Sequence, residues 1–226
     1  MIKKAIILAG GLGSRLRPTT LSINKHLIPI YDKPLIYYPL SLMMLIGIRD
    51  FLLIINKNEK KLFYNLLGDG KHLGINIKYE EQKKPNGIPE AFIIGEKFIN
   101  KSKIALILGD NIFYGQGLIE IIKKSKKFNS GAKIFTYPVQ NPKDFGVVEL
   151  KNKKISKILE KPKQTKSNLA ITGLYFFDKN VTSIAKKLKP SNRNETEIVD
   201  ILNYYLKNKK LSINYLGRGS AWLDTG

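Results

Sequence analysis

A glycine-rich loop followed by two basic residues is the first part of the chain that could do chemistry. Three glycines at positions 10, 11 and 13 follow a short apolar run at residues 4–8, and Arg15 and Lys25 come after them. Glycines let backbone N–H groups approach a phosphate closely, and a guanidinium pairs well with phosphate oxygens. The loop is therefore predicted to hold a phosphate-bearing ligand, with an ordinary strand-to-helix turn as the alternative.

The two best-known phosphate-binding motifs do not fit this loop. A dinucleotide fingerprint, G-x-G-x-x-G, would need a third glycine where Leu16 stands. A P-loop, G-x-x-x-x-G-K-[ST], would need a lysine that does not follow Gly13 at the required spacing. The loop must therefore bind in another way.

Two aspartates are candidates for metal binding. Asp110 follows the apolar segment 104–108 after a single glycine, and Asp224 lies near the end of the chain. Carboxylates suit Mg²⁺, which accepts few protein ligands when phosphates and water complete its octahedron. Gly-Asp-Asn alone is more typical of a turn. Its position after a buried-looking strand favours the functional interpretation, because ligands bind at the carboxyl ends of strands in open α/β sheets.

The elements that must position these residues alternate along the first two thirds of the chain. Short β-rich runs separated by helical periodicity predict a Rossmann-like, mostly parallel α/β sheet flanked by helices, and closely spaced strands after residue 145 predict a smaller antiparallel part. The expected strands are 4–8, 51–55, 75–79, 104–108, 132–139, 147–150, 154–159, 169–177 and 211–216. The expected helices are 34–47, 59–67, 88–99, 118–127 and 195–206, the last with Asn194 as its cap.

Composition narrows the class of protein. The chain has 226 residues, 43% hydrophobic residues and no cysteine, which suits a globular protein of a reducing compartment, and the cytoplasm is expected. The longest apolar stretch, 35–48, contains Pro39 and is shorter than the roughly 20 residues that cross a bilayer. The net charge of +21 suggests nucleic-acid binding, but the lysines are spread along the whole chain, so neither a nucleic acid nor a membrane is an expected partner.

The glycine loop, Pro18, Lys25 and the segment LIPIYDKPLIYYPLSLMMLIGI (27–48) resemble the signature of the sugar-1-phosphate nucleotidyltransferases, most closely their thymidylyltransferase branch that uses glucose 1-phosphate. Further motifs follow in the family's order over essentially the whole chain. They are LLGDG (66–70), Gln82 with Pro85 and Gly87, LILGDNIFYG (106–115), FGVVE (145–149), LEKP (159–162), TGLYFFD (172–178) and GRGSAWLDTG (217–226).

The resemblance implies one domain, with about 1–140 as a nucleotide-binding core and about 141–226 as the sugar-binding part with the second metal ligand. It also implies a Mg²⁺-dependent reaction of dTTP with glucose 1-phosphate that gives dTDP-glucose and pyrophosphate, used in polysaccharide biosynthesis, by a homo-oligomer. Transfer from UTP, ATP or CTP remains an alternative, as does a truncated, non-catalytic relative that binds nucleotide.

The resemblance also implies roles for individual residues. Arg15 and Lys25 would hold the triphosphate and stabilise the leaving pyrophosphate, and Lys161 would bind the sugar phosphate, which makes these three the catalytic residues. Nucleotide binding is assigned to Leu8, Gly10, Gly11, Gly13, Ser14, Arg15, Lys25, His26, Gln82, Pro85, Gly87 and Asp110. Sugar-phosphate binding is assigned to Asn111, Gly146, Glu160, Lys161, Ile171 and Tyr175, and metal binding to Asp110 and Asp224.

Several positions depart from the family pattern. Ser14 replaces a usual threonine, His26 a usual glutamine and Phe145 a usual tyrosine. Trp222 would lie near the site, or would be only a core anchor. Chains of the family continue with helices after the LDTG motif, whereas this one stops at Gly226, either as a fragment or as a short protein. Asp224 therefore lies where fraying is expected.

Overall fold

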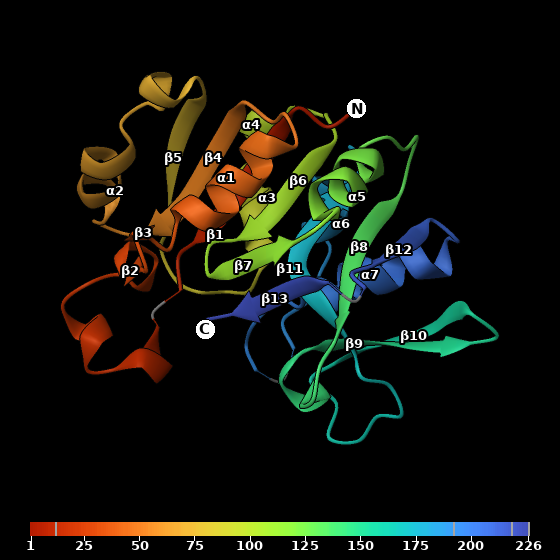
Figure 1. Cartoon of the computed structure of the whole chain (residues 1–226). Helices are drawn as coiled ribbons and strands as arrows, with labels where there is room; N and C mark the ends of the chain where they lie inside the picture. The colour runs from red at the N-terminus through yellow and green to blue at the C-terminus, as the bar shows by residue number, and fades with distance from the viewer. Residues whose placement is uncertain (12, 192, 218, 226) are drawn as a thin grey trace.

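A nine-stranded mixed sheet forms the centre of the protein (Figure 1). This computed structural model describes residues 1–11, 13–191, 193–217 and 219–225, and the sheet lies within them. Seven strands run in the order β10-β9-β11-β6-β1-β4-β5, and β8 pairs with both β11 and β12. The bounds are β1 Lys4–Ala9, β4 Asp50–Asn56, β5 Asn76–Gln82, β6 Ile104–Leu108, β8 Ala132–Pro138, β9 Gly146–Lys151, β10 Lys154–Glu160, β11 Leu169–Phe177 and β12 Leu211–Tyr215.

One half of this sheet is entirely parallel. Strand β1 pairs in parallel with β4 and β6, and β4 pairs in parallel with β5. The central strands are apolar on both faces, as Ile6 and Ile7 show, because both faces are covered. The predicted Rossmann-like α/β arrangement is confirmed, and all four carboxyl ends meet at one edge of the sheet.

The other half is mainly antiparallel. Strand β11 runs antiparallel to β6, β8 and β9, and β9 forms an antiparallel hairpin with β10. The predicted antiparallel part is therefore confirmed. Strand β11 belongs to both halves, and its pairing with β8 shifts register between Ile171 and Tyr175, around Gly173.

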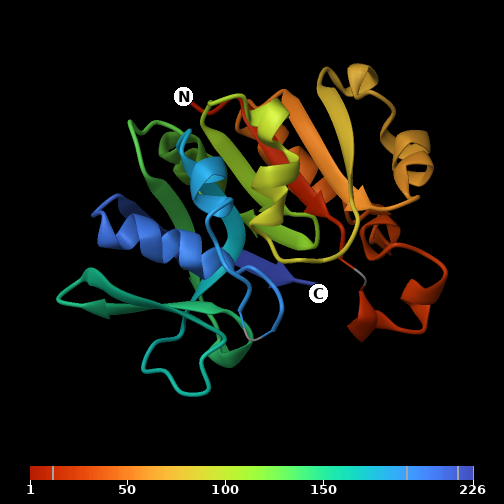
Figure 2. The same cartoon turned by 180° about the vertical axis from the view of Figure 1, so that it is seen from behind.

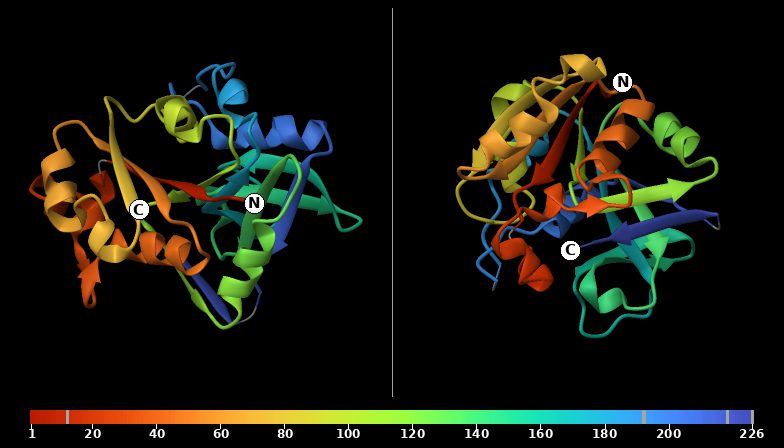
Figure 3. Two further views of the ribbon diagram at one scale, coloured as in Figure 1. Left: turned by 90° about the horizontal axis from the view of Figure 1, so that it is seen from above. Right: turned by 60° about the vertical axis from the view of Figure 1, so that its left-hand side comes forward.

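Helices cover both faces of the sheet (Figures 2 and 3). Successive side chains of β1 point to opposite faces of the sheet and so belong to two different hydrophobic cores. Ile7 belongs to the core with α1, α2 and α5, whereas Ile6 belongs to the core with α3, α4, α6 and α7. The bounds are α1 Tyr37–Leu45, α2 Lys60–Leu67, α3 Glu90–Ile94, α4 Glu96–Ile99, α5 Leu118–Ser125, α6 Val181–Ala185 and α7 Ile198–Lys207. Short 3-10 helices are η1 Ser14–Leu16, η2 Thr19–Leu21, η3 Lys25–Leu27, η4 Lys71–Leu73 and η5 Pro142–Asp144. No helix among the described residues is long and apolar enough to cross a membrane.

Two helices differ from their prediction. The single helix expected over 88–99 is divided at Gly95, where an added Cβ would lie 2.9 Å from the Ile6 side chain, so glycine lets this segment approach the sheet. The last helix begins at Ile198 rather than at Glu195. Asn194 does not cap it, because its φ of 58° is left-handed and it lies outside the helix.

A small second sheet, which the sequence pattern did not predict, carries the end of the chain. Strand β13 (Ser220–Asp224) pairs antiparallel with β7 (Asn111–Gly115), with Asp224 opposite Asn111. The Thr225 backbone N–H and hydroxyl both donate to the Asp110 carbonyl, at 3.1 and 2.8 Å. This pairing holds Asp224 in place, contrary to the expected fraying. A further short hairpin joins β2 (Pro29–Ile30) to β3 (Lys33–Pro34).

Candidate active site

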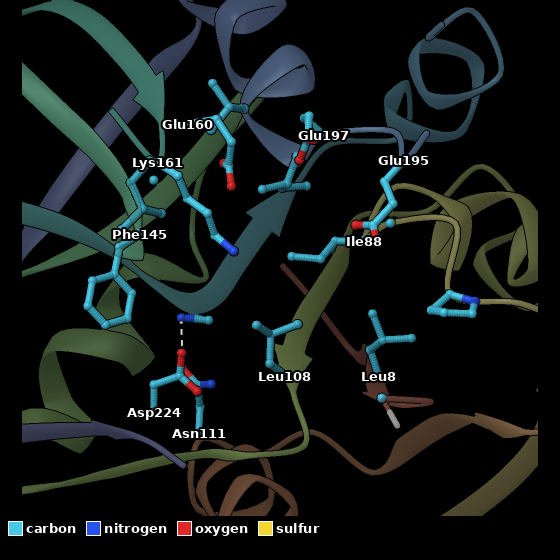
Figure 4. A pocket seen from close by; sticks show the side chains of 18 of the residues that line it. Leu8, Ile88, Leu108, Asn111, Phe145, Glu160, Lys161, Glu195, Glu197 and Asp224 are labelled. Carbon is cyan, nitrogen blue, oxygen red and sulfur yellow. Dashed lines mark hydrogen bonds between the residues drawn. The ribbon is translucent and has the colours of Figure 1, made fainter. Parts of the chain in front are cut away.

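A pocket of about 390 Å³ lies at the carboxyl ends of the parallel strands, between the two halves of the sheet (Figure 4). It collects most of the residues predicted from the sequence. These are Leu8, Gly10, Gly11, Arg15, Gln82, Pro85, Gly87, Asn111, Gly146, Glu160, Lys161, Ile171, Tyr175 and Asp224.

Other predicted residues lie beside the pocket rather than in its lining. Gly13, with a φ of 60°, and Ser14 begin η1, and Lys25, His26 and Asp110 lie close behind the pocket wall. Gly13 tolerates the left-handed conformation that the turn into η1 requires. The structure thus brings Lys25 and Asp110 together, but places neither on the inner surface of the pocket.

The lining also contains residues that were not predicted as site residues. They come from the segment before α7, from the β6 end and from the opposite wall, and they are Ile88, Leu108, Asp144, Phe145, Gly173, Arg193, Glu195, Thr196, Glu197, Ile198 and Val199. Trp222, which was expected either near the site or as a core anchor, also lines the pocket. One usable signal pointed to Arg193. Only five arginines occur in a chain of 39 basic residues, and guanidinium groups are selective for anions.

The glycine loop provides the wall next to β1. An added Cβ on Gly10 would lie 2.6 Å from Oε1 of Gln82, and one on Gly11 would lie 3.2 Å from Cε of Lys25. The absence of side chains therefore lets Gln82 and Lys25 approach the loop. Arg15, which is exposed, extends this wall from η1.

A buried ion pair joins Lys25 to Asp110. The ammonium of Lys25 donates to Oδ2 of Asp110, and the two side chains are only 9% and 14% exposed. Burial by itself would raise the pKa of the Asp110 carboxyl, but Lys25 and the Asn111 amide outweigh it, so this pKa lies below its ordinary value. Asp110 is therefore an anion at neutral pH.

Asn111 connects three strands behind this carboxylate. Its amide nitrogen donates to Oδ1 of Asp110 at 2.9 Å, and its Oδ1 accepts from the Gly173 backbone N–H at 2.9 Å and from Nε1 of Trp222 at 2.6 Å. The side-chain oxygen of Asn111 thus already accepts hydrogen bonds from two donors of the protein. Trp222 also packs edge-on against Phe145, with ring centroids 5.1 Å apart.

Replacing Asn111 by alanine is expected to lower the free energy of unfolding by about 2 kcal/mol, because two buried N–H groups lose their acceptor. Urea unfolding followed by the fluorescence of Trp222, the single tryptophan, measures this. Asn208→Ala is the matched control, since its amide only caps an exposed helix end at 2.8 Å and its loss should cost well under 1 kcal/mol. Equal losses in the two variants would contradict the prediction.

Gln82 and Gly87 form the far end of the pocket. Nε2 of Gln82 donates to Glu90 at 2.5 Å, which directs Oε1 toward Gly10. The Thr196 backbone N–H and hydroxyl both donate to the Asn86 carbonyl, at 2.9 and 3.0 Å. An added Cβ on Gly87 would lie 2.0 Å from the Thr196 carbonyl, so this contact between two loops requires glycine.

Charged side chains fill the opposite end of the pocket. Arg193 donates to Glu160 at 3.1 Å and to Glu197 at 2.6 Å. Burial and the neighbouring Glu197 raise the pKa of the Glu160 carboxyl, and Arg193 and Lys161 only partly oppose this. Figure 4 shows the ammonium of Lys161 pointing into the cavity between Glu160 and Asp224. This end of the pocket can therefore bind both an anion and hydroxyl groups.

Ile171 and Tyr175 lie on β11 at the floor of this end. Both are buried, and burial raises the pKa of the Tyr175 hydroxyl, so Tyr175 stays a neutral phenol. The pocket passes over Gly146, where an added Cβ would lie 3.5 Å from both Glu160 and Ile171. The floor of this end is therefore formed by buried side chains of β11 and by the backbone at Gly146.

Asp110 and Asp224 supply a pair of carboxylates where β6 and β13 end. No group of three or more histidine, cysteine or acidic side chains that could hold a metal occurs among the described residues. Two carboxylates suit Mg²⁺ when phosphate oxygens and water supply the remaining ligands, so this donor set fits a metal that arrives with a nucleotide.

Comparisons with known proteins agree with this geometry. Residues 4–226 match the family described as nucleotidyl transferase. A glucose-1-phosphate thymidylyltransferase from Neisseria meningitidis serogroup A is 52% identical over 99% of this chain and 78% of its own length. The corresponding protein of Mycobacterium tuberculosis is 50% identical over 99% of this chain and 77% of its own length.

Solved structures extend the similarity to the fold. A Bacillus anthracis protein assigned as a glucose-1-phosphate thymidylyltransferase, in complex with sucrose, superposes with a TM-score of 0.90 at 40% identity, over 98% of this chain and 89% of that one. A UDP-glucose pyrophosphorylase in complex with UDP-glucose superposes with a TM-score of 0.86 at 25% identity, over 99% of this chain and 93% of that one. The predicted resemblance is thereby confirmed.

Proposed function

This chain belongs to the nucleotidyl transferase family, and on that premise we propose that it transfers a thymidylyl group from dTTP to glucose 1-phosphate, giving dTDP-glucose and pyrophosphate. The observation that carries the proposal is the pocket itself. One part of its wall is formed by Gly10, Gly11 and Arg15, and the opposite end presents Lys161 beside Glu160. The first suits a triphosphate and the second a sugar phosphate, so about 1–140 would be the nucleotide-binding core and about 141–226 the sugar-binding part.

In the proposed reaction, a phosphate oxygen of glucose 1-phosphate attacks the α-phosphorus of dTTP, and the bond to the β-phosphate oxygen breaks on the opposite side. The phosphate nucleophile is already an anion, so no side chain needs to remove a proton. The work of the protein is to hold two polyanions in line and to offset their repulsion. Arg15 and Lys25 would stabilise the triphosphate and the leaving pyrophosphate, and Lys161 would bind the attacking phosphate.

Mg²⁺, held by Asp110 and Asp224, would neutralise phosphate charge when bound. The glycine backbone and Ser14 would contact the phosphates. Oε1 of Gln82 and the backbone at Gly87 would meet the base, and Glu160 would accept from sugar hydroxyls above Gly146 and Tyr175. This proposal gives His26 and Asn111 no direct contact with substrate, because Nδ1 of His26 is engaged by Asn24, and Oδ1 of Asn111 already accepts from Gly173 and Trp222.

Pyrophosphate release with Mg²⁺ and glucose 1-phosphate tests the proposal, comparing dTTP, UTP, ATP and CTP. We expect dTTP to be preferred and dTDP-glucose to be formed. Preference for another nucleotide would change the assignment of the base. If a folded protein released no pyrophosphate with any of the four nucleotides, the proposal would be overturned. We place the reaction in the cytoplasm and expect a homo-oligomer, which light scattering on the purified protein checks.

The affinity for glucose 1-phosphate is expected to fall in mild acid. Glu160 can accept from sugar hydroxyls with both oxygens only when ionised, and its raised pKa means that it becomes protonated above the ordinary pH for a glutamate. KM for glucose 1-phosphate should therefore begin to rise, as the pH is lowered, at a pH above 4.5, the ordinary pKa of a glutamate. The Glu160→Gln variant has no carboxyl group to titrate at this position. If KM rose equally with falling pH in that variant, the pH dependence would come from the substrate phosphate and not from Glu160.

A further inference from the structure

Three consecutive polar residues are buried at the start of η3. Asn24, Lys25 and His26 are 8%, 8% and 1% exposed, although polar side chains are rarely this buried unless they are paired. Lys25 pairs with Asp110. The other two side chains line no part of the pocket, so their burial needs a separate explanation.

Asn24 is the centre of a hydrogen-bonded chain. Its Nδ2 donates to Oε2 of Glu59 at 2.7 Å, across 35 residues of sequence. A carboxylate can only accept, so this bond fixes which way the amide faces. Oδ1 of Asn24 must then face His26, where it accepts from the backbone N–H and from Nδ1 of the ring, both at 2.8 Å.

The same chain fixes the tautomer of His26. Because Oδ1 of Asn24 is an acceptor, Nδ1 carries the proton and Nε2 does not. Burial lowers the pKa of His26 to about 3, so the ring is neutral at physiological pH. An unprotonated Nε2 cannot donate to a phosphate oxygen, which argues against the expected nucleotide contact of His26.

The far edge of the His26 ring packs against the end of β6. An added Cβ on Gly109 would lie 2.7 Å from Cδ2 and 3.0 Å from Nε2 of His26, and the Gly109 N–H donates to the Leu8 carbonyl at 2.9 Å. Gly109 directly precedes Asp110. The ring therefore separates η3, which carries Lys25, from the strand end that carries the partner of Lys25.

We propose that Glu59, Asn24 and His26 form a relay that positions Lys25 beside Asp110 without touching substrate. Glu59, at the start of α2, fixes Asn24, and Asn24 fixes both the backbone of η3 and the His26 ring. The ring in turn sets the spacing between η3 and Gly109. All three are positioning residues, and their role rests on the proposed function of Lys25.

Glu59→Ala and Glu59→Gln test the relay at the residue farthest from the pocket. Alanine removes the acceptor of Asn24, and we expect kcat to fall about tenfold, while KM for either substrate changes less than about twofold. Glutamine keeps a carbonyl acceptor and should restore kcat. Glu96→Ala is the matched control, because the side chain of Glu96, on α4, forms an exposed ion pair with Lys186 at the end of α6.

The Lys25→Met background distinguishes positioning from general damage. If Glu59 acts through Lys25, Glu59→Ala should cause no further loss of kcat in that background. A tenfold loss that persists there, or an unchanged kcat in Glu59→Ala, would overturn the relay.

Nitrogen NMR of the imidazoles tests the relay without any catalysis. His72 is the other histidine, so His72→Asn leaves His26 alone in the spectrum. We expect protonated Nδ1 in the parent protein and a mixture of tautomers in Asn24→Ser, because its single, shorter hydroxyl cannot reach both Glu59 and Nδ1 of His26, which Asn24 contacts with two separate atoms. Protonated Nε2 in the parent would refute the relay. Absence of pyrophosphate release would instead refute the proposed function and leave this measurement informative.

Discussion

Replacing Lys161 by methionine should reduce kcat/KM for glucose 1-phosphate about a hundredfold or more. Lys25 is paired with Asp110, and Arg193 with two carboxylates, whereas the ammonium of Lys161 points into the pocket (Figure 4). Its backbone holds it there, with a left-handed φ of 40° and an N–H that donates to the Phe145 carbonyl at 3.1 Å. Methionine keeps the length of the side chain and removes only its charge.

Lys163→Met is the matched control for this experiment. Lys163 is exposed two residues farther along the same loop and does not line the pocket. We expect it to retain wild-type kinetics. If both variants lost activity equally, the effect would come from the net charge of the loop, and the proposed contact of Lys161 with the sugar phosphate would be wrong.

Replacing Asp110 by asparagine should abolish activity and also lower the free energy of unfolding by about 3 kcal/mol. The variant leaves the ammonium of Lys25 buried without its counter-charge. Adding Lys25→Met to Asp110→Asn should recover most of the stability, because neither charge is then buried, but none of the activity. Urea unfolding and pyrophosphate release, measured on the parent protein, on Asp110→Asn, on Lys25→Met and on the double variant, separate the two effects.

The surface pair Asp69–Lys71 provides the control, since its side chains are 46% and 82% exposed and Asp69→Asn should leave the free energy of unfolding nearly unchanged. The pH dependence gives an independent check. Because the folded protein holds the pKa of Asp110 below the ordinary value of 3.8, the carboxylate contributes its full stabilisation above that pH and loses it as the pH falls further. A stability loss in Asp110→Asn no larger than that of the surface control would contradict the buried-pair interpretation.

The site illustrates which features local sequence can predict. The glycine loop and Asp110 lie within two residues of the ends of apolar segments, and Arg15 follows in the same loop, so their place at the carboxyl edge of the sheet can be predicted from strand periodicity. Arg193 and Glu197 have no such marker. They line the pocket because the left-handed backbone at Asn194 lies before the start of α7, and because the segment before that helix is hydrogen-bonded to the Asn86 carbonyl.

By itself, the sequence determined the α/β class, the order of the main elements and the family, because hydrophobic periodicity and ordered motifs are local properties of the chain. Only the tertiary structure decided that β13 pairs with β7 and brings Asp224 opposite Asn111, that Lys25 is buried against Asp110, and that His26 faces Asn24. Each of these depends on contacts between segments that are distant in sequence, or on the direction in which a side chain turns once its neighbours are packed. Neither property is encoded in the spacing of residues along one segment.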